Sequence, residues 1–166
     1  MSFVKKYIKN ERGLTLIELL AVVVILGIIA AIAIPSIGGL IDNSKKDAHV
    51  ANAEQMVHAA RLAITSDNSL AVGTHFIPLG YLINQNHLED IKDPDGGTYD
   101  KSVTSYQSTE ANAGNCYVKV VNGKVTEVKM VSTGKNRGVQ SSGGSAVSVN
   151  EIKRSNVNNT AAPVNP

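Results

Sequence analysis

An apolar segment with one carboxylate at its start is the feature that most constrains this chain. No charged residue lies between Leu19 and Ile41, and Glu18 stands immediately before this run. About 20 apolar residues are enough for a helix to cross the hydrocarbon core of a membrane. An ionised side chain costs roughly 2.5–3.5 kcal/mol at the centre of such a helix and less near the interface. A plain anchor has no use for this carboxylate, so we infer that Glu18 pairs with a buried cation.

Basic residues flank the apolar segment on its N-terminal side. Residues 1–13 hold four Lys or Arg and one Glu, a net charge of +3, whereas the whole chain has a net charge of +2. This distribution follows the positive-inside rule and predicts a cytoplasmic N-terminus. A secretory signal peptide is disfavoured, because its apolar core would contain Glu18 and would run past Pro35 to Ile41. A plain transmembrane anchor explains the length and the flanking charge but leaves Glu18 unexplained.

The residues around Glu18 form a motif. A basic leader is followed by Gly13, a carboxylate five residues later and an uninterrupted apolar helix; residues 13–20 read Gly-Leu-Thr-Leu-Ile-Glu-Leu-Leu. This pattern resembles the class III signal of type IV prepilins and pseudopilins. Pro35 falls where that family usually has a kink-forming proline. Leu14 differs from the Phe most often found there, although other apolar residues also occur at this position in the family.

The resemblance implies a processing route. A prepilin peptidase would cleave between Gly13 and Leu14 on the cytoplasmic side and N-methylate Leu14. The new amine would be mostly protonated at neutral pH, and it would pair with Glu18 of a neighbouring subunit. Breaking one side of a buried ion pair costs roughly 3–5 kcal/mol, so this contact would set the register between subunits. The alternative, in which Glu18 pairs within its own chain or reaches the membrane interface, stays open.

The resemblance also implies partners and a location. The precursor would cross the cell membrane once, with its N-terminus in the cytoplasm, and the mature chain would join a helical homopolymer at the cell surface. Expected partners are other copies of the chain, the prepilin peptidase, a pilus assembly ATPase with its membrane platform protein, and minor pilins. No catalytic residue, cofactor or metal is expected.

Apolar periodicity continues beyond the membrane segment. Val50, Ala53, Val57, Ala60 and Ile64 recur at steps of three and four residues, which predicts an amphipathic helix that ends near Asp67-Asn68.

Between the two helical halves, Pro35 and the pair Gly38-Gly39 predict a weakened, flexible zone. We therefore expect five parts. They are a leader (1–13), a transmembrane or filament-core helix (14–41), an amphipathic helix (42–66), a globular head (67–137) and a low-complexity C-terminal segment (138–166).

The head contains a strong β-hairpin signal. Two β-branched runs, residues 115–121 and 124–132, flank Asn122-Gly123, and an Asn-Gly pair suits a type I′ turn with positive φ at both positions. We expect a third strand near residues 103–107, an edge strand at 146–149 and mobility in the last ten residues. The predicted fold class is α+β, with a long N-terminal helix packed on a small antiparallel sheet.

The segment between helix and hairpin, residues 66–114, is rich in turn-forming residues, and we expect it to be irregular. Gly80-Tyr81-Leu82 followed by Lys-Asp-Pro-Asp-Gly-Gly at 92–97 resembles a region of Gram-positive pilins and major pseudopilins. Asp93, Asp95 and Asp100 also suggest calcium. The EF-hand pattern fails because Gly97 stands where a ligand is needed, so a turn is favoured.

Charge divides the head along the sequence. Residues 42–114 carry five Lys or Arg and ten Asp or Glu, a net charge of −5, and residues 115–166 carry seven Lys or Arg and two Glu, a net charge of +5. A solvated surface is the ordinary interpretation, and complementary subunit contacts or attraction of polyanions are the alternatives. The basic residues from Lys119 to Arg154 would suit contact with DNA, although no aromatic side chains accompany them as stacking platforms.

Enzymatic chemistry has little support in the sequence. Cys116, the single cysteine, is expected to be a buried strand residue. Glu54 and His58 are four residues apart on the predicted helix, but two ligands make a poor metal site, and a solvated face is favoured. The histidines are scattered at positions 49, 58, 75 and 87.

Three functions remain in view. The first is a structural subunit of a type IV pilus that serves adhesion, motility or surface functions. The second is a pseudopilin of a competence DNA-uptake or type II-like secretion machine, and the third is a plain membrane-anchored surface module.

Overall fold

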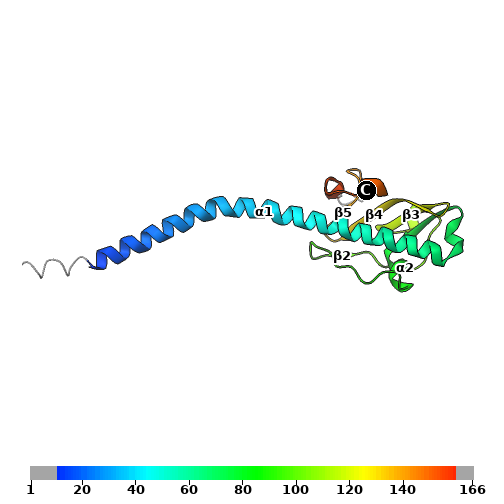
Figure 1. Cartoon of the computed structure of the whole chain (residues 1–166), viewed down its shortest axis with the longest axis horizontal. Helices are drawn as coiled ribbons and strands as arrows, with labels where there is room; N and C mark the ends of the chain where they lie inside the picture. The colour runs from blue at the N-terminus through cyan, green and yellow to red at the C-terminus, as the bar shows by residue number, and fades with distance from the viewer. Residues whose placement is uncertain (1–10, 160–166) are drawn as a thin grey trace, which may run out of the picture. The chain divides into compact units, whose positions relative to one another are not determined.

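A computed structural model describes residues 11–159, with side chains from residue 15 onward. The chain separates into two compact units that meet between Asp42 and Asn43. Helix α1 (Glu11–Ser66) contributes to both units (Figure 1). The predicted leader falls mostly outside the described residues, because residues 1–10 are not described.

The first unit consists, in its described part, of the apolar half of α1. Pro35 lies inside the helix, and the helix continues through Gly38 and Gly39. The predicted weakening is therefore not seen as a break. Proline removes one backbone donor from the hydrogen-bond ladder, and glycine keeps both backbone groups even though it lowers helix propensity. A Cβ added at either glycine would meet no atom within 4 Å beyond the adjacent helix backbone, so close packing does not require glycine there.

The amphipathic half of α1 belongs to the second unit, the head. Its buried face includes Ala53, Met56, Val57, Ala60 and Ala63, which extends the stripe expected from the sequence. The helix ends at Ser66, as predicted. Its last turn is closed by the hydroxyls of Thr65 and Ser66, which both donate to the carbonyl of Leu62.

The head is built around one antiparallel sheet in the order β1-β3-β4-β5-β7, with β2 and β6 also paired to β4. The strands are β1 (Thr74–Pro78), β2 (Thr98–Tyr99), β3 (Cys116–Val121), β4 (Lys124–Thr133), β5 (Arg137–Val139), β6 (Val147–Ser148) and β7 (Val157–Asn159). A short helix, α2 (Leu79–Asn84), follows β1, and 3-10 turns occur at η3 (Asn68–Ala71), η4 (Glu110–Asn112), η5 (Val149–Glu151) and η6 (Arg154–Asn156). The buried face of α1 and the apolar side chains of the sheet form a shared core, so the α+β prediction is confirmed.

The predicted hairpin is confirmed. Val121 pairs with Lys124 across the turn, and both turn residues have positive φ, 49° at Asn122 and 73° at Gly123. The turn is held to the segment before β1, because the amide of Asn122 donates to the carbonyl of Gly73 and the amide of Gly73 donates to Asn122 Oδ1.

The prediction of a strand at residues 103–107 is wrong. Within the described chain, Gln107 forms only an isolated bridge with Phe76, and β1 pairs with β3 in its place. A strand has two edges, and those of β3 are taken by β1 and β4. The backbone of Lys101 and Val103 instead packs over Gly80, where an added Cβ would lie 2.3 Å and 2.5 Å from their carbonyl oxygens.

The C-terminal segment contributes strands to the head. The edge strand expected at 146–149 appears as β6, which pairs with Glu127 and Val128 of β4. Mobility was predicted for the last ten residues, but Val157–Asn159 form β7 beside β5. The remaining seven lie outside the described residues.

Candidate functional site

The predicted cleavage junction lies in the first turn of α1, which begins at Glu11. The structure describes Gly13 and Leu14 by their backbone, which is helical, and does not describe their side chains. Cleavage and methylation at this junction therefore stay predictions. A peptidase that cuts here needs close approach to the backbone, which glycine allows because it has no side chain.

Glu18 is exposed on α1, four residues beyond Leu14. Its large apolar neighbours Leu16 and Leu19 are also exposed. Among the described side chains, Glu18 has no hydrogen-bond or ion-pair partner. The single chain therefore offers this carboxylate no described cation.

The apolar half of α1 is exposed on every side. Its large aliphatic side chains have relative exposures between 51% and 71%, from Leu16 through Ile41. A helix that is apolar all round needs lipid or other protein around it. By length and composition, α1 is the one helix among the described residues that could cross a membrane.

Pro35 lies near the C-terminal end of this apolar half and is exposed, as is its neighbour Ile34. Its expected part in assembly stays a prediction.

A buried polar cluster in the head joins α1 to the turn that follows α2. His49 of α1 and Asp93 and Asp95 of the turn place ligand-type atoms within 4.8 Å of one another. His49 Nε2 is 2.9 Å from Asp95 Oδ2 and 3.7 Å from Asp93 Oδ1. His49 is 1% exposed, and its Nδ1 is 2.8 Å from the hydroxyl of Tyr99.

The turn itself satisfies much of this cluster. Asp93 accepts hydrogen bonds from the amides of Asp95 and Gly97 and from the hydroxyl of Ser132. Asp95 Oδ1 lies 3.3 Å from Lys45 Nζ and 3.5 Å from Arg137 Nη1.

A metal ion would have to approach these carboxylates beside two fixed cations, and Coulomb repulsion opposes that. We interpret the cluster as an internal ion-pair network that fastens the turn to the helix.

Protonation in this network follows from its contacts. Burial raises the pKa of Asp95, but hydrogen bonds from His49 and Lys45 and the charge of Arg137 outweigh it, so the pKa lies below the ordinary value. Burial raises the pKa of Tyr99, so its hydroxyl stays protonated. A neutral His49 that donates from Nε2 to Asp95 and accepts at Nδ1 from Tyr99 satisfies both contacts.

Sequence reasoning placed Asp93 and Asp95 together in a turn but missed His49, which lies 44 residues earlier. The missed signal was the position of His49 on the helix face that also carries Ala53 and Met56. A histidine on a buried face needs polar partners. Glu54 and His58, by contrast, are exposed, which agrees with the predicted solvated face.

The acidic part of the head (42–114) and its basic part (115–166) partly neutralise each other through ion pairs within the chain. Arg137 pairs with Asp95, and Arg154 makes a bidentate contact with Asp47. The pKa of Asp47 is lowered by its hydrogen bond with Arg154. Two arginines of the basic C-terminal part are therefore occupied by acids of the other part, which weakens the expectation of a broad basic surface for DNA.

Cys116 is buried in β3, as predicted, and its thiol donates to the carbonyl of Val131 at 3.2 Å. Burial raises the pKa of this thiol to about 12. The thiolate needed for nucleophilic or redox chemistry is therefore scarce at neutral pH.

Comparison with protein families gives a match in the N-terminal part of the chain. Residues 8–34 match the prokaryotic N-terminal methylation motif. This match supports the resemblance to type IV pilin-like precursors, with the processing by prepilin peptidase and the pilus-type assembly that the motif implies. It covers the expected junction, Glu18 and most of the apolar half of α1, and it does not extend to the head. No solved structure matches the chain.

Proposed function

We propose that the chain is a structural subunit of a type IV pilus. After cleavage between Gly13 and Leu14, the apolar half of α1 leaves the membrane and packs with the same segment of other copies. The head, carried on the amphipathic half of the helix, then forms the outer part of the filament and serves adhesion, motility or another surface function.

The observation that carries this proposal is Glu18 in its setting. The carboxylate stands in the matched motif, on a helix that is apolar all round, and no described side chain of its own chain pairs with it. Cleavage would remove the basic leader and create an amine at Leu14, four residues from Glu18 along the chain, and this cation exists only in processed chains. Lipid satisfies the apolar side chains but not the carboxylate, whereas a neighbouring processed copy satisfies both.

A pseudopilin of a DNA-uptake or secretion machine is the second candidate. Its assembly chemistry would be the same, and the motif match covers it equally. The head would then contact the DNA or protein that the machine moves. Its arginines Arg137 and Arg154 are already paired with aspartates. This pairing favours the pilus over a DNA-uptake role that depends on those two side chains.

The processing step is tested by intact-protein and N-terminal peptide mass spectrometry of chains recovered from the membrane and from sheared surface filaments. Filament material should begin at N-methylated Leu14. Gly13→Val should leave the precursor uncleaved in the membrane, because a β-branched side chain crowds the scissile backbone. Gly27→Val, a change of the same chemistry in the exposed apolar half of α1, is the matched control and should still be cleaved.

A mature chain that begins at Met1, both in the membrane and at the surface, would instead support the third candidate, a plain membrane-anchored surface module.

A further inference from the structure

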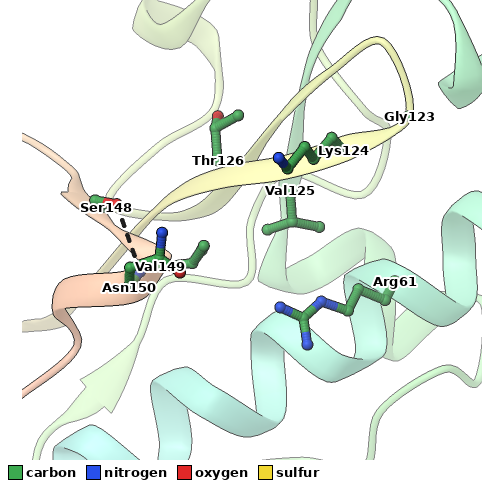
Figure 2. Close-up of a pocket in the computed structure, with 8 residues that line it drawn as sticks. All are labelled: Arg61, Gly123, Lys124, Val125, Thr126, Ser148, Val149 and Asn150. Atoms are coloured by element: carbon green, nitrogen blue, oxygen red, sulfur yellow. Dashed lines mark hydrogen bonds between the residues drawn. The ribbon is translucent and has the colours of Figure 1, made fainter.

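A hollow of 590 Å³ opens in the head between helix α1 and the start of strand β4 (Figure 2). It falls in the size range of small-ligand sites in proteins, about 300–1,000 Å³. Its lining comes from three parts of the head: Arg61 of α1; Gly123, Lys124, Val125 and Thr126 of the hairpin; and Ser148, Val149 and Asn150 around η5. All of these residues belong to the head unit.

Two uncompensated cations line this hollow. Arg61 and Lys124 are both exposed, and neither has a hydrogen bond or ion pair with any described residue. The other two arginines with described side chains, Arg137 and Arg154, are both bound to aspartates. No acidic side chain lines the hollow, so its lining carries two positive charges and no negative one.

Neutral hydrogen-bond groups also line the hollow, to one side of the two cations (Figure 2). The hydroxyl of Ser148 accepts from the amide of Asn150 at 3.4 Å, as the dashed line in Figure 2 shows, and its own proton remains to be donated. The side-chain amide of Asn150 has no partner among the described residues.

The strand edge adds further polar groups. Strand β6 covers β4 only at Glu127 and Val128, so in the described part of the chain residues 124–126 have no strand partner on that edge.

These groups suit an oxyanion. The guanidinium of arginine presents parallel N–H donors that match a carboxylate or phosphate, and lysine adds a mobile point charge. No aromatic ring lines the hollow, so a stacked base or another flat apolar ligand finds no platform. We propose that this hollow is an anion-binding site for a phosphate or carboxylate group, which Arg61 and Lys124 hold with Ser148 and Asn150 as neutral donors. The site does not depend on the proposed pilus function.

The proposal is tested with the full chain in a non-ionic detergent by NMR titration with inorganic phosphate at constant ionic strength. The signals to follow are the side-chain Nε–H of Arg61 and the backbone amides of Lys124 and Asn150. These signals should shift and saturate. Arg61→Gln and Lys124→Gln should each weaken phosphate binding at least tenfold, and because both side chains are exposed, the rest of the spectrum should stay unchanged.

Lys135→Gln is the matched control, since Lys135 is an exposed lysine in the turn between β4 and β5 and its substitution removes the same charge. It should change the affinity by less than twofold. Shifts that do not saturate in the wild type, or equal weakening by all three substitutions, would overturn the proposal. A parallel titration with acetate distinguishes the two sources of the anion: tighter binding of phosphate points to a phosphate-bearing ligand, and tighter binding of acetate points to an acidic side chain or other carboxylate.

Discussion

The two halves of helix α1 use apolar residues in opposite ways. In the head, the amphipathic half places small residues such as Ala53 and Ala60 against the sheet, where they are 0% exposed. In the apolar half, Ile32 and Ile34 are each 71% exposed, and every large aliphatic side chain from Leu16 to Ile41 is exposed. The head therefore has its core within one chain, whereas the apolar half depends on what surrounds the chain. The difference indicates that the apolar half needs lipid or other protein around it, whereas the head does not.

The largest expected effect contrasts one isoleucine of the head with one of the apolar half of α1. Ile77→Ala in β1 removes a fully buried side chain and should lower the free energy of unfolding of the head by about 2–5 kcal/mol. Ile32→Ala should leave it unchanged, because the side chain is exposed in the single chain. Chemical denaturation of the full chain in a non-ionic detergent, followed by tyrosine signals of the head, measures both. Equal losses would break the comparison.

A second contrast concerns a glycine in the sheet. At Gly138 of β5, an added Cβ would lie 1.9 Å from the carbonyl oxygen of Met130, so Gly138→Ala must displace the backbone of β4. Overpacking of this kind costs about 1–3 kcal/mol. Gly143→Ala is the control, because its Cβ would come no closer than 4.0 Å to Ser141 Oγ. If both variants unfold at the same denaturant concentration, the described packing of β5 on β4 is wrong.

The polar cluster of the head gives a third test. His49→Ala removes the donor to Asp95 and the acceptor for the Tyr99 hydroxyl, and buried polar groups left without partners cost about 1–3 kcal/mol. His58→Ala, on the exposed face of the same helix, should stay within about 0.5 kcal/mol of the wild type. The two midpoints of thermal unfolding report the difference. A stable His49→Ala protein would show that the turn holds to the helix without this contact.

The smallest expected effect is on acid stability. The folded pKa of Asp95 lies below its ordinary value, which is near 3.9 in unfolded chains. Its stabilising contribution is therefore fully present above that value and is lost as the pH falls through the folded pKa. Asp95→Asn should flatten the dependence of the unfolding midpoint on pH below about 4. Asp47, Asp67 and Asp100 also have lowered pKa values, so part of the slope should remain, and an unchanged slope in the variant would contradict the network.

Local signals in the sequence were sufficient for several elements. The steps of three and four residues predicted the amphipathic helix, and Asn122-Gly123 predicted the β3–β4 hairpin, because both patterns involve neighbours in sequence. Partners distant in sequence were harder. Residues 103–107 looked suited to the sheet, but β1 occupies the edge of β3, and this competition is decided by tertiary packing.

The candidate sites show the same limit. Gly13, Leu14 and Glu18 form a contiguous motif, so the sequence alone could predict the junction and the docking carboxylate. The cluster around Asp95 draws on Lys45, His49 and Arg137, which no spacing rule connects. The hollow beside Arg61 likewise combines a helix, a hairpin and a segment near the C-terminus.

The account depends most on the claim that Glu18 is satisfied by another copy of the chain. The direct measurement is the yield of sheared surface filaments from cells that express Glu18→Ala, with precursor and processed chain quantified in the membrane. Glu54→Ala, which removes an exposed carboxylate from the head half of the same helix, is the control. We predict that Glu18→Ala is processed and retained in the membrane with filaments abolished or severely reduced, while Glu54→Ala assembles normally. Normal filament yield from Glu18→Ala would contradict the account.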